Sequence, residues 1–263
     1  MLITRALIGI IGVPLTILVI YTGGVPLLIA LILLTLLGLH EFYHMTAAYR
    51  PNRLAGFLGA VLVLVGAYTG HLEGALRGTV YLFGLTFLLS AIRGLRPSMV
   101  VEMAVTYFGA FYISVGFAHI LLLRSPVFGI SLTVVVLLAT WTSDTVAFLV
   151  GHYYGHRPIS PVVSTRKTIE GTLAGFLGTI LVVLVAGKSL GWMSSGQFFI
   201  LGLALAIAAP LGDLFESYLK RASNVKDAGT IIPGHGGILD RFDSLLFAGV
   251  TAFYLVSALV GTR

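Results

Sequence analysis

The chain lacks cysteine altogether and has few charged residues for its length. Without cysteine it can form no disulfide bond, no cysteine-ligated zinc site and no thiol nucleophile. Only 10% of its 263 residues are charged, whereas 57% are hydrophobic. A soluble domain usually carries about 25% charged residues, because its surface has to face water. We therefore expect an integral membrane protein, most of whose surface faces lipid.

The charge that is present is mainly basic, with 16 Lys and Arg against 10 Asp and Glu. An isoelectric point near 9.7 would also suit a nucleic-acid-binding protein. The basic residues, however, lie in short groups between apolar runs and form no continuous stripe. Their distribution argues against a nucleic-acid partner and is better explained by membrane topology.

The apolar runs have the length of membrane-spanning helices, because a hydrocarbon core of about 30 Å requires roughly 20 helical residues. We predict an all-α, polytopic membrane protein with about nine transmembrane helices, over residues 4–22, 25–46, 55–71, 78–93, 99–123, 127–150, 170–193, 196–219 and 241–261. With a cytoplasmic N-terminus, twelve of the 16 basic residues fall on the cytoplasmic side. This bias follows the positive-inside rule and predicts that the N-terminus is cytoplasmic.

The predicted spans divide into two regions. Residues 1–98 hold about four N-terminal spans, and residues 99–263 hold about five spans of a catalytic region with cytoplasmic loops at 151–169 and 220–240. No repeat of 20–50 residues is visible, so an inverted-repeat transporter has no support. Glycines at four-residue spacing, such as Gly171 and Gly175, predict close packing between helices.

Acidic residues are concentrated in the second half of the chain. Seven of the ten lie after residue 140: Asp144, Glu170, Asp213, Glu216, Asp227, Asp240 and Asp243. Some of them fall inside or at the end of apolar helices, where an ionisable side chain is costly and usually functional. We therefore expect a functional polar site in this half.

The end of the span over 196–219 carries the first group of these residues. Asp213, Glu216 and Lys220 are three and four residues apart, which places them on one helix face. Glu216 and Lys220 can form a structural ion pair within the helix. This pairing would leave Asp213 without a partner, so we expect Asp213 to be the metal ligand of the group.

A glycine-rich loop and the next helix carry the second group. Gly234, Gly236 and Gly237 permit a close approach of the backbone to a ligand. Asp240 and Asp243 follow on the first turn of the last helix, where one of them could serve simply as an N-terminal cap. Carboxylates without a His or Cys pair favour a hard cation such as Mg²⁺. Such a cation beside Lys and Arg is suited to polyphosphate chemistry.

Three stretches resemble segments of the phosphatidate cytidylyltransferase family. Residues 217–243 read SYLKRASNVKDAGTIIPGHGGILDRFD and fill the positions of the family's 27-residue signature. Residues 144–155 (DTVAFLVGHYYG) and 164–171 (STRKTIEG) are similar to two further segments. The chain departs from the family at His152, where Lys or Arg is usual, and at Thr165, which replaces Pro. The resemblance covers roughly residues 100–263.

The resemblance implies transfer of a cytidylyl group from CTP to phosphatidic acid, giving CDP-diacylglycerol and pyrophosphate for phospholipid biosynthesis. It implies a catalytic set of Asp213, Asp240, Asp243 and Lys226, and an Mg²⁺ site of Asp213, Asp240 and Asp243 with Asp144 as a fourth ligand. The implied substrate-binding residues are Ser164, Arg166, Lys167, Thr168, Glu216, Ser217, Lys220, Arg221, Asp227, His235, Gly236, Gly237 and Arg241.

The implied partners are CTP, phosphatidic acid and the lipid bilayer, with no nucleic acid. A bacterial inner membrane with the active site at its cytoplasmic face is the expected location. A second cation and a homodimer are both left open by the sequence.

Other functions were weighed against this one. His40, Glu41 and His44 match the H-E-x-x-H motif of zinc proteases, although a third ligand would be required. Such a protease would not explain the Lys and Arg around Asp213 and Asp240. A transporter would not explain why the charges gather at one face of the membrane. A CDP-alcohol phosphotransferase would require a different spacing of aspartates, whereas a related cytidylyltransferase for another lipid stays open.

Overall fold

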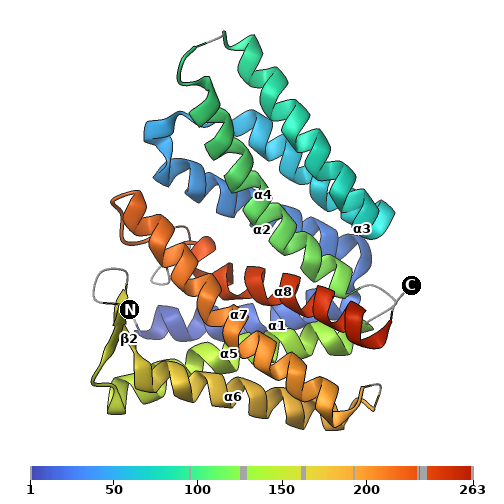
Figure 1. Ribbon diagram of the computed structural model, residues 1–263, viewed down its shortest axis with the longest axis vertical. Helices are drawn as coiled ribbons and strands as arrows, with labels where there is room; N and C mark the ends of the chain where they lie inside the picture. The colour runs from blue at the N-terminus through green and yellow to red at the C-terminus, as the bar shows by residue number, and fades with distance from the viewer. Residues whose placement is uncertain are drawn as a thin grey trace. The chain divides into compact units, whose positions relative to one another are not determined.

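Most of the described chain forms long helices (Figure 1). The computed structural model describes residues 2–94, 96–124, 129–160, 164–191, 193–229, 231 and 236–261, with the backbone alone at 2–9, 160 and 164–166. Its helices are α1 (Leu2–Thr22), α2 (Gly24–Met45), α3 (Arg53–Ile92), α4 (Met99–Leu123), α5 (Gly129–Tyr154), α6 (Ile169–Lys188), α7 (Ser195–Ala222) and α8 (Leu239–Val260), with a short 3-10 helix, η1, at Ala47–Tyr49. The prediction of an all-α polytopic membrane protein is confirmed.

Seven of these helices, α2 to α8, are long and apolar enough to cross a membrane, within the residues that the structure describes. The side chains of α1 are described only from Ile10 onward, and this described part, Ile10–Thr22, is a shorter apolar segment. The number of nine spans and the cytoplasmic N-terminus stay predictions. Among the helices that correspond singly to one predicted span, the boundaries differ most at α6, which ends at Lys188 where we expected residue 193.

Helix α3 explains why two spans were predicted where one 40-residue helix is assigned. The backbone leaves helical geometry at Gly70 and His71, where φ is −126° and 50°. The chain then folds back on itself. The evidence is the close approach of Gly78 to Val63: a Cβ atom added at Gly78 would lie 2.6 Å from the Cα atom of Val63. Residues 53–69 and 72–92 are therefore two arms of a helical hairpin, which correspond to the predicted spans 55–71 and 78–93.

The chain forms two compact units. The first consists of Met1–Leu122 and Ser223–Arg241, and the second of Leu123–Ala222 and Phe242–Arg263. In the first unit, the end of α2 is joined to α4 by a hydrogen bond of 2.7 Å from the Tyr43 hydroxyl to the carbonyl oxygen of Thr106. The start of α3 is joined to α4 as well, since the Asn52 amide donates to the Thr106 hydroxyl at 2.8 Å.

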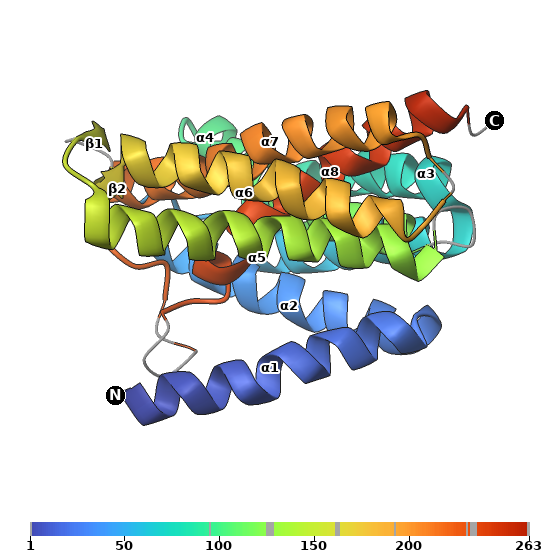
Figure 2. The ribbon, with the colours of Figure 1, turned by 90° about the horizontal axis from the view of Figure 1, so that it is seen from below.

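In the second unit, α5 and α6 lie side by side (Figure 2), and small residues allow their close approach. A Cβ atom at Gly175 would lie 2.7 Å from the carbonyl oxygen of Ser143, and one at Gly171 would lie 2.5 Å from that of Ala147. These contacts confirm the prediction that Gly171 and Gly175 pack against another helix, which is α5. The predicted division into N-terminal spans (1–98) and a catalytic region (99–263) stays a prediction.

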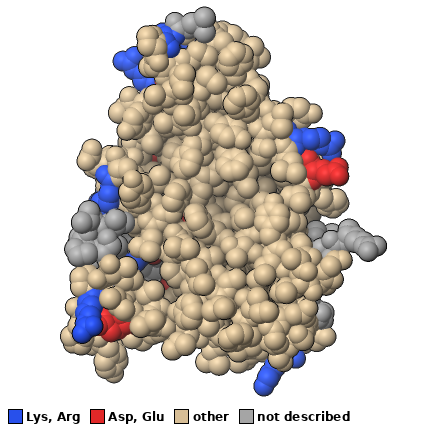
Figure 3. Space-filling model, in the orientation of Figure 1, with Lys and Arg blue, Asp and Glu red and all other residues tan. Residues whose placement is uncertain are grey.

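Helix α6 places its small side chains inside and its large ones outside. Gly171, Gly175, Thr179, Val183 and Gly187 are buried. Its leucines and valine on the other face are more than half exposed, with Leu173 at 59%, Leu177 at 65%, Leu181 at 63% and Val185 at 60%. A helix that buries its small residues and exposes its large apolar ones is unfavourable in water but suited to a lipid environment. Figure 3 agrees, because charged side chains cover little of the face that it shows.

A short β-hairpin between α5 and α6 was not predicted. Strands β1 (Pro158–Ser160) and β2 (Ser164–Thr168) pair antiparallel, with Pro158 opposite Thr168 and Ser160 opposite Ser164. The Glu170 carboxylate fixes the entry to the hairpin by accepting the backbone amides of His156 at 3.2 Å and Arg157 at 3.3 Å. The hairpin sets the position of Lys167 and Thr168 at the start of α6.

We expect residues on either side of α6 to lie on opposite faces of the membrane. Twenty helical residues at about 1.5 Å each span roughly 30 Å, the thickness of the hydrocarbon core. Ser164→Cys and Lys188→Cys, introduced singly into a chain that has no other cysteine, should react with an impermeant maleimide from opposite sides of sealed vesicles. Labelling of both positions from the same side would show that α6 does not cross the membrane.

Candidate active site

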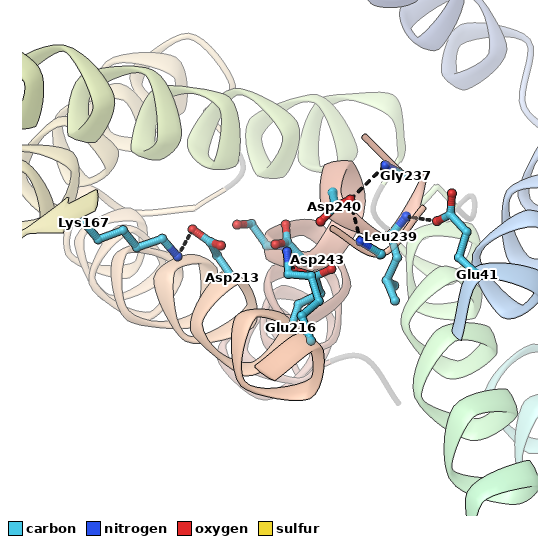
Figure 4. A network of polar contacts seen from close by, with 11 residues as sticks. Glu41, Lys167, Asp213, Glu216, Gly237, Leu239, Asp240 and Asp243 are labelled. Carbon is cyan, nitrogen blue, oxygen red and sulfur yellow. Dashed lines mark hydrogen bonds and ion pairs between the residues drawn. The ribbon is translucent and has the colours of Figure 1, made fainter. Parts of the chain in front are cut away.

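Asp213 lies near the cytoplasmic end predicted for α7 and forms an ion pair with Lys167 (Figure 4). Lys167 comes from strand β2, and both side chains are about one-third exposed, at 27% and 30%. Our expectation that Asp213 has no partner is therefore wrong. The partner was missed because it lies on a different element, which the spacing within α7 does not reveal.

Glu216 and Lys220 form the intrahelical ion pair that the sequence allowed. The Glu216 side chain is fully buried and that of Lys220 is 12% exposed. A carboxylate in this environment needs a nearby positive charge, and Lys220 supplies it four residues along the same helix. The pair thus has a structural function in addition to any contact with a substrate.

Asp243 is the most enclosed aspartate of the second unit, at 7% exposed. The close approach of α7 and α8 encloses it, because a Cβ atom at Gly212 would lie 2.5 Å from the carbonyl oxygen of Asp243. One of its carboxylate oxygens accepts the backbone amide of Ser244 at 2.6 Å. It also lies within electrostatic range of three other carboxylates, Asp213, Glu216 and Asp144.

Asp240 lies one helical turn before Asp243, and it organises the loop that precedes α8. Its Oδ2 atom accepts the backbone amides of Gly237 at 2.8 Å and Ala228 at 3.1 Å (Figure 4). Gly236 adopts a φ of +84°, a conformation that other residues rarely adopt. Asp240 therefore binds the loop that precedes α8 and not the first amides of the helix, so these bonds are not the N-terminal cap considered as an alternative.

The carboxylates around Asp243 suit a divalent cation by their chemistry. They offer oxygen ligands only, and their mutual repulsion is relieved by added positive charge. In the described ranges, no three His, Asp or Glu side chains already stand at the spacing of a metal site. Mg²⁺ is often held by one or two carboxylates, with water and substrate phosphates as its other ligands. The full ligand set of Asp213, Asp240, Asp243 and Asp144 stays a prediction of the family resemblance.

The other predicted residues have varied surroundings. Thr168 caps α6, its hydroxyl accepting the Gly171 amide at 3.2 Å, and Ser217 is half-buried. Five lie at the surface or in bends of the loop: Arg221, Lys226, Asp227 and Arg241 are exposed, and Asp144 is exposed on α5. The structure describes only the backbone of Ser164 and Arg166, and His235 lies outside the described residues.

Sequence reasoning missed the contact of Glu41 with the start of α8. In the H-E-x-x-H motif, His40 and His44 are exposed, whereas Glu41 is only 2% exposed. The Glu41 carboxylate accepts the backbone amides of Ile238 at 3.0 Å and Leu239 at 2.9 Å. The oxygens that a zinc protease would use as a general base are therefore engaged with the start of α8. The sequence did contain a signal for such a contact, because Glu41 is a carboxylate near the end of an apolar helix.

A family model described as "Cytidylyltransferase family" matches residues 3–259. The chain belongs to this family. The match covers almost the whole chain and includes the N-terminal helices, which lie outside the residues that carried the family resemblance. It agrees with the family that the signature at 217–243 indicated.

Relatives from several organisms agree with this assignment. The chain is 31% identical to a phosphatidate cytidylyltransferase of Staphylococcus epidermidis over 251 residues, which are 92% of this chain and 94% of the relative. It is 30% identical to one of Synechocystis sp. over 294 residues, 97% of each chain. It is 41% identical to one of Thermotoga maritima over 140 residues, 51% of this chain and 52% of the relative.

The ion pairs Lys220–Glu216 and Lys167–Asp213 should contribute very differently to the stability of the protein. Lys220→Met removes the ion-pair partner of the fully buried Glu216 and should lower the free energy of unfolding by about 3 kcal/mol. Lys167→Met breaks a pair of partly exposed side chains and should cost no more than about 1 kcal/mol. Unfolding by SDS in mixed micelles measures both values.

The double variant Glu216→Gln with Lys220→Met is the control, because it removes both charges together. It should be more stable than Lys220→Met alone. Equal destabilisation by the two lysine substitutions would contradict a buried, structural pair at Glu216.

Proposed function

We propose that the protein is an Mg²⁺-dependent phosphatidate cytidylyltransferase. It transfers the cytidylyl group of CTP to phosphatidic acid and releases CDP-diacylglycerol and pyrophosphate, a step of phospholipid biosynthesis. The observation that carries the proposal is the coverage of the relatives, two of which align over more than nine-tenths of this chain at 30% identity or more. The grouping of Asp213, Glu216 and Asp243 with Lys167 and Lys220 supplies the acidic and basic groups for such a reaction.

The reaction requires positioning and charge neutralisation more than acid–base chemistry. A phosphate oxygen of phosphatidic acid is already ionised at neutral pH, so it can attack the α-phosphorus of CTP without a strong base. A bond forms between this oxygen and the α-phosphorus while the bond from the α-phosphorus to the β-phosphate oxygen breaks, and pyrophosphate leaves with that oxygen. Fixed charges that hold the reactants in line supply most of the rate in transfers of this kind.

The residues of this chain have separate functions in the proposed reaction. Asp213, Asp240 and Asp243, with Asp144, would hold Mg²⁺, which when bound neutralises charge on the transferring group. Arg221 and Lys226 are exposed, so they are the basic residues that CTP would contact first. Lys167 and Lys220 are held beside carboxylates and would face the phosphates at closer range.

The proposed location is the cytoplasmic face of the bacterial inner membrane. CTP is a soluble nucleotide and phosphatidic acid is a membrane lipid, so the two meet at the interface. The basic loops at 151–169 and 220–240 are the ones that the positive-inside rule places in the cytoplasm. A homodimer stays a prediction of the sequence.

The aspartates should be required for activity through the metal. Asp213→Asn, Asp240→Asn and Asp243→Asn each preserve the side-chain shape but remove a negative ligand. Turnover of phosphatidic acid by the purified protein should fall by about two orders of magnitude or more in each case, because metal stabilisation of phosphoryl charge contributes several kcal/mol. EDTA should abolish the wild-type activity, and Mg²⁺ or Mn²⁺, but not Zn²⁺, should restore it.

His40→Ala and His44→Ala are the matched controls, because these exposed side chains belong to the rival zinc motif. Both variants should retain cytidylyl transfer. Active aspartate variants, together with an essential histidine pair and co-purifying zinc, would refute the proposed function in favour of a metalloprotease.

Replacing Lys167 or Lys226 should lower catalytic activity and leave the fold intact. Lys167→Ala and Lys226→Ala each remove a charge-assisted contact to a phosphate, whose loss costs about 1.5–3 kcal/mol. We expect kcat/KM to fall roughly ten- to 150-fold, with helical circular dichroism unchanged. Wild-type kinetics in both variants would remove these lysines from the active site.

A further inference from the structure

Glu41 is a buried acidic residue that the proposed chemistry does not use. It lies near the C-terminal end of α2 and accepts the backbone amides of Ile238 and Leu239 at 3.0 and 2.9 Å (Figure 4). These amides stand at the start of α8, where the first N–H groups of a helix have no partner within the helix. Ile238 has no side-chain acceptor with which to cap α8. Glu41 supplies this cap from a distant part of the chain.

The loop before α8 is closely fitted to the Glu41 carboxylate. A Cβ atom added at Gly229 would lie 2.5 Å from Oε1 of Glu41, and one at Gly237 would lie 2.5 Å from its Oε2. Both distances are shorter than any real contact of a Cβ atom, so a side chain at either position would displace the loop or the carboxylate. The described residues of the segment Ser223–Arg241, which we name the signature segment, thus enclose the carboxylate at two points, Gly229 and Gly237.

Asp240 binds the same stretch of backbone that Glu41 holds. Gly237 donates its amide to Oδ2 of Asp240 at 2.8 Å, while a Cβ atom added to it would meet the Glu41 carboxylate. Leu239, the next residue but one, donates its amide to Glu41. The orientation of Asp240 therefore depends on the backbone that Glu41 fixes, and Asp243 follows one turn later on the same helix.

The core of the first unit holds Glu41 itself in place. Its neighbours Phe42 and Tyr43 are 2% and 0% exposed. The Tyr43 hydroxyl is bonded to α4 through Thr106, and Thr106 in turn accepts the amide of Asn52, the cap of α3. Three N-terminal helices thus fix the point from which the carboxylate extends.

We infer that Glu41 is a positioning residue for cytidylyl transfer: it anchors the signature segment and the first turn of α8, so that Asp240 and Asp243 are held ready for the metal and the phosphates. The inference rests on the proposed function for its effect on catalysis. It gives the N-terminal helices a function, and it explains a buried Glu between two exposed His.

The test combines amide hydrogen exchange with kinetics on the full-length protein in detergent. Glu41→Gln retains the size of the side chain but replaces one acceptor oxygen by an amide donor, which faces a backbone N–H. In the absence of substrate and with EDTA present, the amides of Ile238 and Leu239 should exchange roughly ten- to 150-fold faster, the range expected for loss of a hydrogen bond to a charged group. The value of kcat should fall in the same range, while the KM for CTP changes much less.

Glu102→Gln is the matched control, because Glu102 is also a buried carboxylate of the first unit. It is 4% exposed, accepts the Ser98 hydroxyl at 2.7 Å and pairs with Arg96 at 3.6 Å. None of these contacts involves the signature segment. Exchange at Ile238 and Leu239, and kcat, should both match the wild type in this variant.

Gly229→Ala tests the same contact from the other side and leaves Glu41 intact. Its Cβ atom should press on the carboxylate, and it should raise exchange at Ile238 and Leu239 and lower kcat as Glu41→Gln does. Unchanged exchange in both variants, or equal effects from Glu102→Gln, would overturn the inference. A wild-type protein without cytidylyl transfer would refute the proposed function alone, because the exchange measurement requires no activity.

Discussion

A carboxylate buried among apolar helices has to be compensated by another group, and the candidate site is built on this constraint. The compensation differs from one residue to the next. Glu216 has Lys220 on its own helix, Asp213 has Lys167 from a β-strand, and Glu41 has two backbone amides. Asp243 is surrounded by further negative charge, which a divalent cation would relieve. Asp243 is one of the four carboxylates that the family resemblance assigns to the metal.

The fold was largely predictable because the membrane limits the choice of structure. A spanning segment must satisfy its own backbone hydrogen bonds, so a long apolar run is a helix. The same reasoning separated the two arms of α3, where Gly70 and His71 break an otherwise continuous helix. It did not reveal the β-hairpin at Pro158–Thr168, because a short polar loop carries no periodic pattern.

The site was predictable where neighbours in space are also neighbours in sequence. The pairing of Glu216 with Lys220 followed from a spacing of four residues. The partner of Asp213 did not, because Lys167 lies on another element. Glu41 was harder still, since its partners are backbone amides and any residue other than proline can provide them. The H-E-x-x-H pattern includes Glu41, but it indicated a zinc site, whereas Glu41 binds backbone amides.

The central claim is that this chain moves the cytidylyl group of CTP onto a lipid. The fate of the phosphates tests it most directly, with purified protein, phosphatidic acid, Mg²⁺ and CTP radiolabelled at either the α- or the γ-phosphate. The account predicts that the α-label enters the lipid fraction while the γ-label appears as pyrophosphate in equal amount, and that Asp243→Asn suppresses both. A γ-label in the lipid, or CTP hydrolysis without any labelled lipid, would contradict it.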